Sequence, residues 1–289
     1  MNFGLALALA CALATSVSFL LKHRGAVLAP PVRLRHPLRS AAELFRSKWF
    51  AVGWLVAVGA WALHVGALAL APLSIVQAVL SAGLVFLAVL AERFFGFHLG
   101  RRQWIGVIIT AAGLAVIGLT QEAHPGGPPG YALAALIAIE CGVLLLASGV
   151  AAMSGRLNLQ PSWEGMLLGA AAGALFGISD IAIKFLTDAV EDGVLELISP
   201  WTFAALAASV VAFYASARGL QLGPGVEVIA ITAVAANLVA IVGGVLVFRD
   251  LVGTGAVEVT GRTVAFGLVI AGAALIPAPL RAARRPAYE

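Results

Sequence analysis

Two charged residues stand four positions apart in an apolar stretch of the chain. Asp180 and Lys184 lie within residues 164–186, and residues four apart on a helix share one face and can pair. The same face carries a row of glycines, Gly165, Gly169, Gly173 and Gly177. Small residues at this spacing are typical of close helix contacts in membranes. Since charges inside a membrane are costly, this pair is predicted to face protein and to contact a solute or ion. Alternatively, Lys184 reaches the outer surface and Asp180 neutralises it.

An aromatic group is predicted to accompany a histidine. Trp61 precedes His64 by three residues, and Trp54 precedes Trp61 by seven, so all three share one face of a helix. An aromatic wall with one titratable group suits a small organic solute, cationic ones included. The alternative is a buried histidine bonded to a neighbouring carbonyl.

Further polar residues lie in other apolar stretches. Glu140, Asp180 and Glu227 are the carboxylates that we place within membrane spans. Magnesium prefers oxygen ligands, so these three are the metal candidates, although sequence cannot show that they converge. For the two glutamates, a role without solute or metal binding is the alternative: Glu227 reaches water, and Glu140 stays protonated and hydrogen-bonded. The remaining solute-contact candidates are uncharged: Ser18, Gln77 and Asn237.

The sequence contains no catalytic constellation. It carries no nucleotide-binding loop, no metalloprotease motif and no nucleophile paired with a base. We therefore expect no enzyme and no cofactor. Cys11 and Cys141 both fall in apolar stretches, so neither a disulfide framework nor a metal pattern follows from them.

Composition places the chain in a membrane. Hydrophobic residues make up 61% of it and charged residues 11%, and the mean hydropathy is +1.01. Soluble domains have about a quarter charged residues. The basic balance therefore reports orientation in a bilayer, and no nucleic-acid partner is expected.

Uncharged runs divide the chain into spans. The run from Trp49 to Ala91 has 43 residues, which as one helix would be about 65 Å long, twice the roughly 30 Å of a bilayer core. Pro72 in its middle marks the break. We expect an all-α membrane protein with nine transmembrane helices, at residues 2–21, 49–70, 73–91, 103–120, 131–153, 164–186, 199–217, 225–247 and 263–280.

The basic residues predict which way the chain is inserted. If the basic, partly amphipathic segment 22–48 lies along the cytoplasmic face, with Leu38, Ala42 and Phe45 on one side, fifteen of the eighteen Lys and Arg residues fall inside. Arg249 and Arg262 fall outside, and Lys184 lies within a span. The positive-inside rule then places the N-terminus outside and the C-terminus in the cytoplasm.

The chain also contains an internal repeat. A shift of 152 residues places Trp49 on Trp201, Leu68 on Leu220 and Pro72 on Pro224, so both prolines are predicted hinges. Residues 100–106, "GRRQWIG", match 261–267, "GRTVAFG", and the sequence around Lys22 matches that around Lys184. Spans one to four thus correspond to spans six to nine. An odd number of helices between equivalent spans inverts the second unit, as in many secondary transporters.

The repeat defines the predicted organisation. Residues 1–121 form the first four-helix unit, 131–153 a linking helix, 163–280 the inverted second unit and 281–289 a cytoplasmic tail.

These motifs carry a family resemblance. The lysine ending the first helix, the "LAP" hairpin and the turn "AERFFGFHLGRRQWIG" resemble the drug/metabolite transporter superfamily (EamA-like). Each half resembles a small multidrug resistance subunit, which works as an antiparallel pair. The essential glutamate of those subunits would fall at Ala14 and Phe176. The stretch "LFRSKWFAVGW" with "ALAPLSIVQA", and the nine spans, are most similar to the NIPA-type magnesium transporter branch.

We therefore expect a plasma-membrane transporter that moves a small solute by alternating access. The resemblance implies magnesium or another divalent cation. An exporter or flippase of a small organic or lipid-linked metabolite is the alternative, and a non-transporting scaffold or accessory protein is a third. The expected partners are the solute and the lipid bilayer, and the oligomeric state stays open between monomer and homodimer.

Overall fold

A computed structural model describes most of the chain. The described residues are 2–33, 36–70, 76, 79–80, 83–119, 133–189, 193, 198–247 and 256–276. The regular elements in these ranges are helices: α1 (Asn2–Leu28), α2 (Pro37–Phe45), α3 (Lys48–Leu70), α5 (Gly83–Phe95), α6 (Arg101–Leu119), α7 (Leu133–Met153), the short η1 (Ser154–Arg156), α8 (Pro161–Ala189), α9 (Pro200–Leu222), α10 (Gly225–Val247) and α11 (Ala256–Leu275).

Five helices in the described part are long and apolar enough to cross a membrane. They are α1, α3, α7, α8 and α9, and α10 adds a shorter apolar stretch at Gly225–Ala240. An all-α membrane protein is therefore confirmed. The predicted crossings at 73–91, 103–120, 225–247 and 263–280 stay predictions, and all of them except 225–247 fall partly outside the described residues.

Several helix boundaries differ from the predicted spans, and two of them differ by seven residues. The last predicted span began at residue 263, whereas α11 begins at Ala256. The first was predicted to end at residue 21, whereas α1 continues to Leu28. Nothing near Lys22 breaks a helix, and the first prolines come at Pro30 and Pro31. Lys22 is therefore a residue inside α1, not the first residue of a loop.

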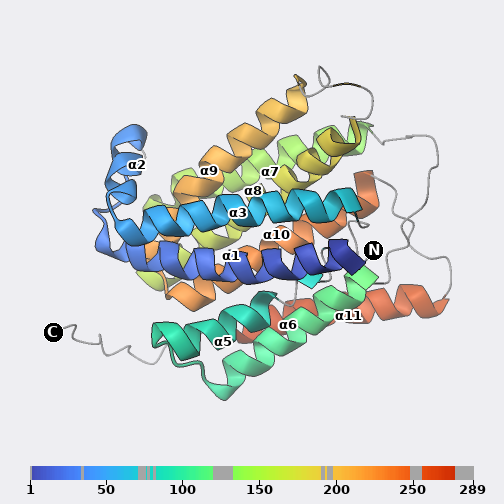
Figure 1. The fold of residues 1–289 in the computed structure, drawn as a ribbon, viewed down its shortest axis with the longest axis horizontal. Helices are drawn as coiled ribbons and strands as arrows, with labels where there is room; N and C mark the ends of the chain where they lie inside the picture. Colours follow the sequence, from blue (N-terminus) through green and yellow to red (C-terminus); the bar gives the residue numbers. More distant parts are fainter. Residues whose placement is uncertain are drawn as a thin grey trace.

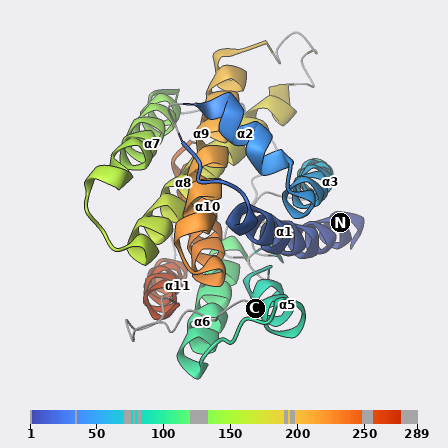
Figure 2. The ribbon, with the colours of Figure 1, turned by 90° about the vertical axis from the view of Figure 1, so that its left-hand side faces the viewer.

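The long helices run back and forth along one axis. Figure 1 shows that each runs opposite to the preceding one, and Figure 2 looks along the bundle from the end where α1 finishes and α3 begins. Most of the described basic residues belong to helix termini and connections at this end, which we call the basic end: Lys22, Arg24, Arg33, Arg39, Arg46, Lys48, Arg93, Arg101, Arg102, Arg156 and Arg218.

The glycine row of α8 packs against two neighbouring helices, as predicted. A methyl group at Gly169 would lie 3.0 Å from the carbonyl oxygen of Val228, and one at Gly177 would lie 2.7 Å from that of Ala236. At the basic end, Gly165 meets Gly219 of α9 and Gly223, the residue that follows α9. With no side chain between them, the helix backbones approach closely, which fixes α8 at the centre of the bundle.

The first three long helices pack in a similar way. Gly53 of α3 lies against Lys22 and Ser18 of α1. Gly66 lies near Leu7, so α1 and α3 are antiparallel. The hydroxyl of Ser16 donates to the carbonyl of Gly83 at the start of α5, at 3.0 Å.

A separate antiparallel pair is formed by α6 and α11. Gly106 faces Gly272, and Gly113 faces Ala265 and Val269. A methyl group on either glycine would come within 3.0 Å of a backbone carbonyl oxygen of α11.

The connection between α1 and α3 is tied to α9. The amide of Gln221 donates to the carbonyls of Ala26 and Pro30, and Tyr214 donates to the carbonyl of Pro37 at 3.0 Å. On α2, Ser40 and Leu44 are the buried residues. The predicted apolar side of Leu38, Ala42 and Phe45 is exposed, as a helix lying along a membrane surface requires.

We predict that the close contact of α8 with α10 is a main source of stability. A methyl group at Gly173 would overlap the carbonyl oxygen of Thr232, so Gly173→Ala should destabilise the fold by about 1–3 kcal/mol. Gly59→Ala on α3 is the matched control, because nothing lies within 4 Å of a methyl group there. Thermal unfolding of the detergent-purified protein measures the difference. Equal melting temperatures for both variants would contradict the predicted packing.

Candidate functional site

A cavity of about 270 Å³ lies among α1, α3, α5, α8 and α10. Each of these helices contributes to its wall, and most of the wall is apolar. The polar residues of the wall are Cys11, Thr15, Ser16, Ser18, Lys22, Trp61, His64, Asp180, Thr232 and Asn237. We call it the central cavity.

One level of the central cavity holds a carboxylate beside an imidazole. The Nε2 atom of His64 lies 3.7 Å from Oδ1 of Asp180, and the two side chains are 8% and 27% exposed. This separation is too long for a hydrogen bond, but it becomes an ion pair when His64 is protonated. His64 Nε2 has no hydrogen-bond partner in the described part of the chain. Nε2 therefore makes no bond to a carbonyl there, and the alternative of a buried histidine bonded to a neighbouring carbonyl stays a prediction.

The positions of these two side chains follow from helix packing. Asp180 comes three residues after Gly177, whose contact with Ala236 and Val239 fixes this part of α8 against α10. His64 and Trp61 lie on the same wall of α3 as Ala57 and Ala60, at helical spacings of three and four residues. The cavity thus brings together polar side chains from helices that are far apart in sequence.

The basic end of the central cavity holds a lysine. The ammonium of Lys22 lies 4.0 Å from the centre of the Phe19 ring, a cation–π contact. Lys22 is eleven residues from Cys11, which lines the cavity together with Asp180. At 1.5 Å per residue, that is a rise of about 16 Å along α1. The cavity therefore has an acidic level and a cationic level at different depths.

Hydroxyl groups line the wall between these levels. Ser16 and Thr232 donate to backbone carbonyls of their own helices, at 2.9 and 2.8 Å. Ser18 is different, because its buried hydroxyl has no hydrogen-bond partner among the described residues. Together with the amide of Asn237, Ser18 could bind a polar solute.

Five of the nine predicted solute-contact residues line the cavity: Ser18, Trp61, His64, Asp180 and Asn237. Lys184, one turn beyond Asp180, does not line it. Trp54 is also separate from Trp61 and His64, because it packs edge-on against Phe45 of α2 at 5.6 Å. Gln77 and the predicted hinge Pro72 lie outside the described residues. Pro224 immediately precedes α10, and its carbonyl accepts from Val228 at 3.0 Å.

The three metal candidates do not come together. Glu227 accepts a hydrogen bond from Gln103 of α6 at 2.8 Å. Glu140 is buried in α7 at 2% exposure, and no described residue hydrogen-bonds to its carboxylate oxygens. Within the described ranges, no group of three His, Cys, Asp or Glu side chains could hold a metal ion. Asp180 is thus the carboxylate that the central cavity offers.

Sequence reasoning missed several residues of the cavity wall. Lys22 was assigned to a cytoplasmic segment, although its match with Lys184 was a signal for a place inside a helix. Cys11, Thr15 and Phe19 follow the same face of α1 at spacings of four residues, but they resemble ordinary apolar helix positions in sequence.

The comparisons with known proteins point to one relative. The chain is 27% identical over 268 residues to the protein named "Probable magnesium transporter NIPA9" of Arabidopsis thaliana, a match that covers 86% of this chain and 74% of the relative. No family profile and no solved structure matches the chain. The similarity thus extends over most of the length of both proteins.

We predict that the central cavity contains water, because Ser18, His64 and Asn237 line it. Without the native cysteines (Cys11→Ser, Cys141→Ser), Thr15→Cys should react with a small charged methanethiosulfonate. Leu13→Cys is the control on the same helix. Leu13 does not line the cavity, lies about 200° around α1 from Thr15 and is 45% exposed where lipid is expected. Equal labelling of both variants in membranes would contradict a water-filled cavity.

Proposed function

We propose that this chain is a secondary transporter that moves magnesium by alternating access around the central cavity. The observation that carries the proposal is the meeting of Asp180, His64 and the unbonded hydroxyl of Ser18 in a cavity between the two predicted units. Helices α1, α3 and α5 belong to the first unit, and α8 and α10 belong to the second. Relative movement of the two units would open the cavity to one side or the other.

Similar helix packing in both units supports the repeat. The offset from Lys22 to Lys184 is 162 residues, and that from Trp49 to Trp201 is 152. With these offsets, Ser18 corresponds to Asp180, and Gly53 corresponds to Ala205. The contact of Ser18 with Gly53 therefore predicts a contact between these two residues of the second unit. In α8, the neighbouring Ser179 donates to the carbonyl of Ala205 at 3.3 Å. Equivalent helices therefore meet within one residue of the same register.

The third helix of each unit packs against the first in a similar way. Ser16 donates a hydrogen bond to Gly83, and with the same offsets these residues correspond to Ile178 and Ala235. Gly177, next to Ile178, packs on Ala236, next to Ala235. In both units the first helix thus meets the third at an equivalent level.

The directions of the helices support inversion. The imidazole of His23 in α1 lies 3.2 Å from the carbonyl oxygen of Leu220 at the end of α9. At the other level of the bundle, Cys11 lines the central cavity with Asp180. Because α8 begins near the end of α9, through Gly165 and Gly219, α1 and α8 run in opposite directions. The last helices of the two units, α6 and α11, are antiparallel to each other.

The orientation completes the proposal. With nine crossings, the basic end faces the cytoplasm, as the positive-inside rule requires. The N-terminus is then outside, and Pro72 and Pro224 connect equivalent helices on opposite surfaces.

Magnesium is the preferred solute because of the similarity to a named magnesium transporter and because Asp180 gives the cavity an anionic oxygen group. Magnesium usually keeps several of its waters and binds through one or two carboxylates. A hydrated ion could therefore use Asp180 directly, with Ser18 and Asn237 binding its waters.

A small organic or lipid-linked metabolite is the second candidate. Trp61, Phe19 and Phe176 line the same cavity. Lys22 adds a cation at a different depth from Asp180, so the cavity suits an extended solute with groups of both signs.

We predict that equivalent positions of the repeat are reached from opposite sides of the membrane. Gly100 immediately precedes α6, and its equivalent Gly261 lies in the second turn of α11. In the cysteine-free chain, Gly261→Cys should react with an impermeant thiol reagent in intact cells, and Gly100→Cys only in inside-out vesicles. Both positions have room for a side chain, since nothing lies within 4 Å of a methyl group at Gly261 and the nearest atom to one at Gly100 is 3.7 Å away. Labelling of both from one side would exclude inversion.

We predict saturable magnesium flux into proteoliposomes that contain the purified chain. Asp180→Asn should reduce the flux about tenfold or more, because a charge-assisted contact contributes roughly 1.5–3 kcal/mol. Glu43→Gln is the control, since Glu43 pairs with Arg39 on α2, outside the cavity. A folded protein with no flux above empty liposomes would exclude magnesium and turn the search to organic solutes. If those also fail to cross, the scaffold or accessory role is favoured.

A further inference from the structure

A second and larger cavity lies at the basic end, away from the central cavity. It has a volume of about 700 Å³ and is formed by α7, η1, α8, α9 and the residues Val32, Arg33 and His36 between α1 and α2. We call it the basic-end pocket. None of its lining residues belongs to the wall of the central cavity.

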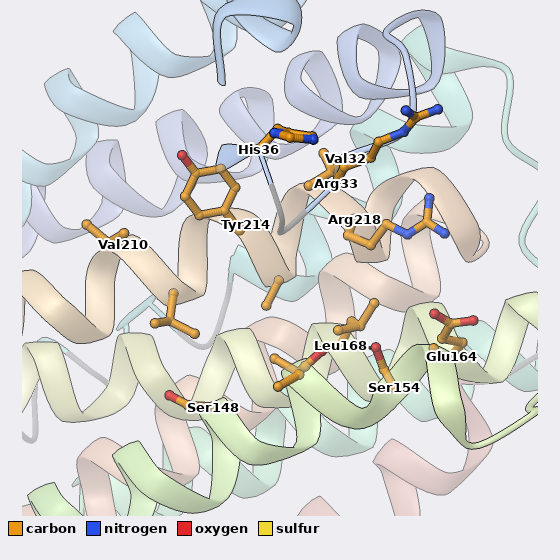
Figure 3. Close-up of a pocket in the computed structure, with 15 residues that line it drawn as sticks. Val32, Arg33, His36, Ser148, Ser154, Glu164, Leu168, Val210, Tyr214 and Arg218 are labelled. Carbon is orange, nitrogen blue, oxygen red and sulfur yellow. Dashed lines mark hydrogen bonds between the residues drawn. The ribbon is translucent and has the colours of Figure 1, made fainter. Parts of the chain in front are cut away.

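The basic-end pocket has a charged end and an apolar end. Figure 3 shows the guanidinium groups of Arg33 and Arg218 and the carboxylate of Glu164 at one end, and Val210 and Ser148 at the other. Val210 precedes Arg218 by eight residues on α9, a rise of about 12 Å. The apolar end therefore extends from the basic end toward the middle of the bundle.

The cations of the pocket have no anionic partner within the described ranges. No salt bridge is present at Arg33, Arg218 or His36 in that part of the chain, although Arg39 nearby has one with Glu43. Glu164 belongs to the first turn of α8, where a carboxylate stabilises the helix dipole. Two arginines against one carboxylate leave the charged end positive, and His36 adds a further positive charge when protonated.

The wall that carries Arg33 is held in place by hydrogen bonds. The amide of Arg33 donates to the hydroxyl of Ser40 at 3.0 Å, and the amide of Val32 donates to the side chain of Gln221 at 2.9 Å. Tyr214 links α9 to Pro37. The backbone that carries Arg33 is thus fixed relative to Arg218 before any ligand binds.

We propose that the basic-end pocket binds an anionic phospholipid of the cytoplasmic leaflet. The phosphate would lie between Arg33 and Arg218, because guanidinium groups form paired hydrogen bonds with phosphate oxygens. An acyl chain would follow the apolar end past Val210, along helices that are long and apolar enough to cross the membrane. Basic pockets between transmembrane helices on the cytoplasmic side suit such headgroups. The inference uses the proposed orientation but not the identity of the transported solute.

The test is equilibrium binding of radiolabelled dioleoylphosphatidylglycerol to the delipidated full chain in detergent. Saturable binding is expected, and Arg218→Gln or Arg33→Gln should raise the Kd about tenfold, as expected for one lost charge-assisted contact. Arg46→Gln is the matched control, because Arg46 is an exposed basic-end residue outside the pocket. Ser148→Trp should weaken binding by filling the apolar end while leaving both arginines in place. Thermal unfolding establishes that each variant is folded.

Competition separates a lipid from a soluble anion. Unlabelled phosphatidylglycerol should displace the label, whereas inorganic phosphate and glycerol 3-phosphate should not. Equal displacement by glycerol 3-phosphate would assign the pocket to a water-soluble anion and overturn the proposal. Equal displacement by phosphatidylcholine or phosphatidylethanolamine, or an unchanged Kd in both arginine variants, would also overturn it. Because the assay measures binding, its outcome is independent of any result on magnesium flux.

Discussion

The close approach of α8 to α10 is the contact on which the rest of the structure depends. Most backbone amides of a membrane helix are satisfied within their own helix, so such helices associate mainly through side-chain packing and close backbone contact. Three glycines of α8, at positions 169, 173 and 177, permit that contact at three successive turns, against Val228, Thr232 and Ala236. The same row leads directly to Asp180. A carboxylate that would be costly in lipid is thereby kept in a protein cavity.

The two cavities differ in the charged groups that line them. The central cavity has Asp180 and His64 at one level and Lys22 at another, and it lies between helices of both units. The basic-end pocket has cations with little acidic compensation and lies beside α9. If both proposals hold, a lipid bound next to α9 would contact the helix that packs against α8 and holds the segment after α1. Lipid composition could then influence how the two units move.

The proposed internal repeat relates the helices of the scaffold more closely than it relates the side chains of the central cavity. If the repeat holds, corresponding helices pack in matching registers, yet side chains at corresponding positions differ in chemistry. The partner of Asp180 in the first unit is Ser18, and both line the cavity. Lys22 lines it as well, whereas its equivalent Lys184 does not. A pseudo-symmetric frame with an asymmetric lining can bind a solute in one defined orientation while its two halves exchange positions.

The sequence by itself determined the class of the protein, most helix positions and the close packing of α8. Hydropathy, proline positions and small-residue spacing are local properties, and burial in lipid leaves a chain few alternatives to helices. The sequence also identified Asp180, His64, Trp61, Ser18 and Asn237, because polar groups are conspicuous in apolar stretches. It did not decide which of them meet. Only the tertiary structure separated Glu140 and Glu227 from Asp180, left Trp54 outside the cavity that Trp61 lines, and brought Lys22 into the cavity. Those outcomes depend on the rotation and relative height of packed helices, which arise from contacts such as Gly53 with Lys22 and Gly177 with Ala236.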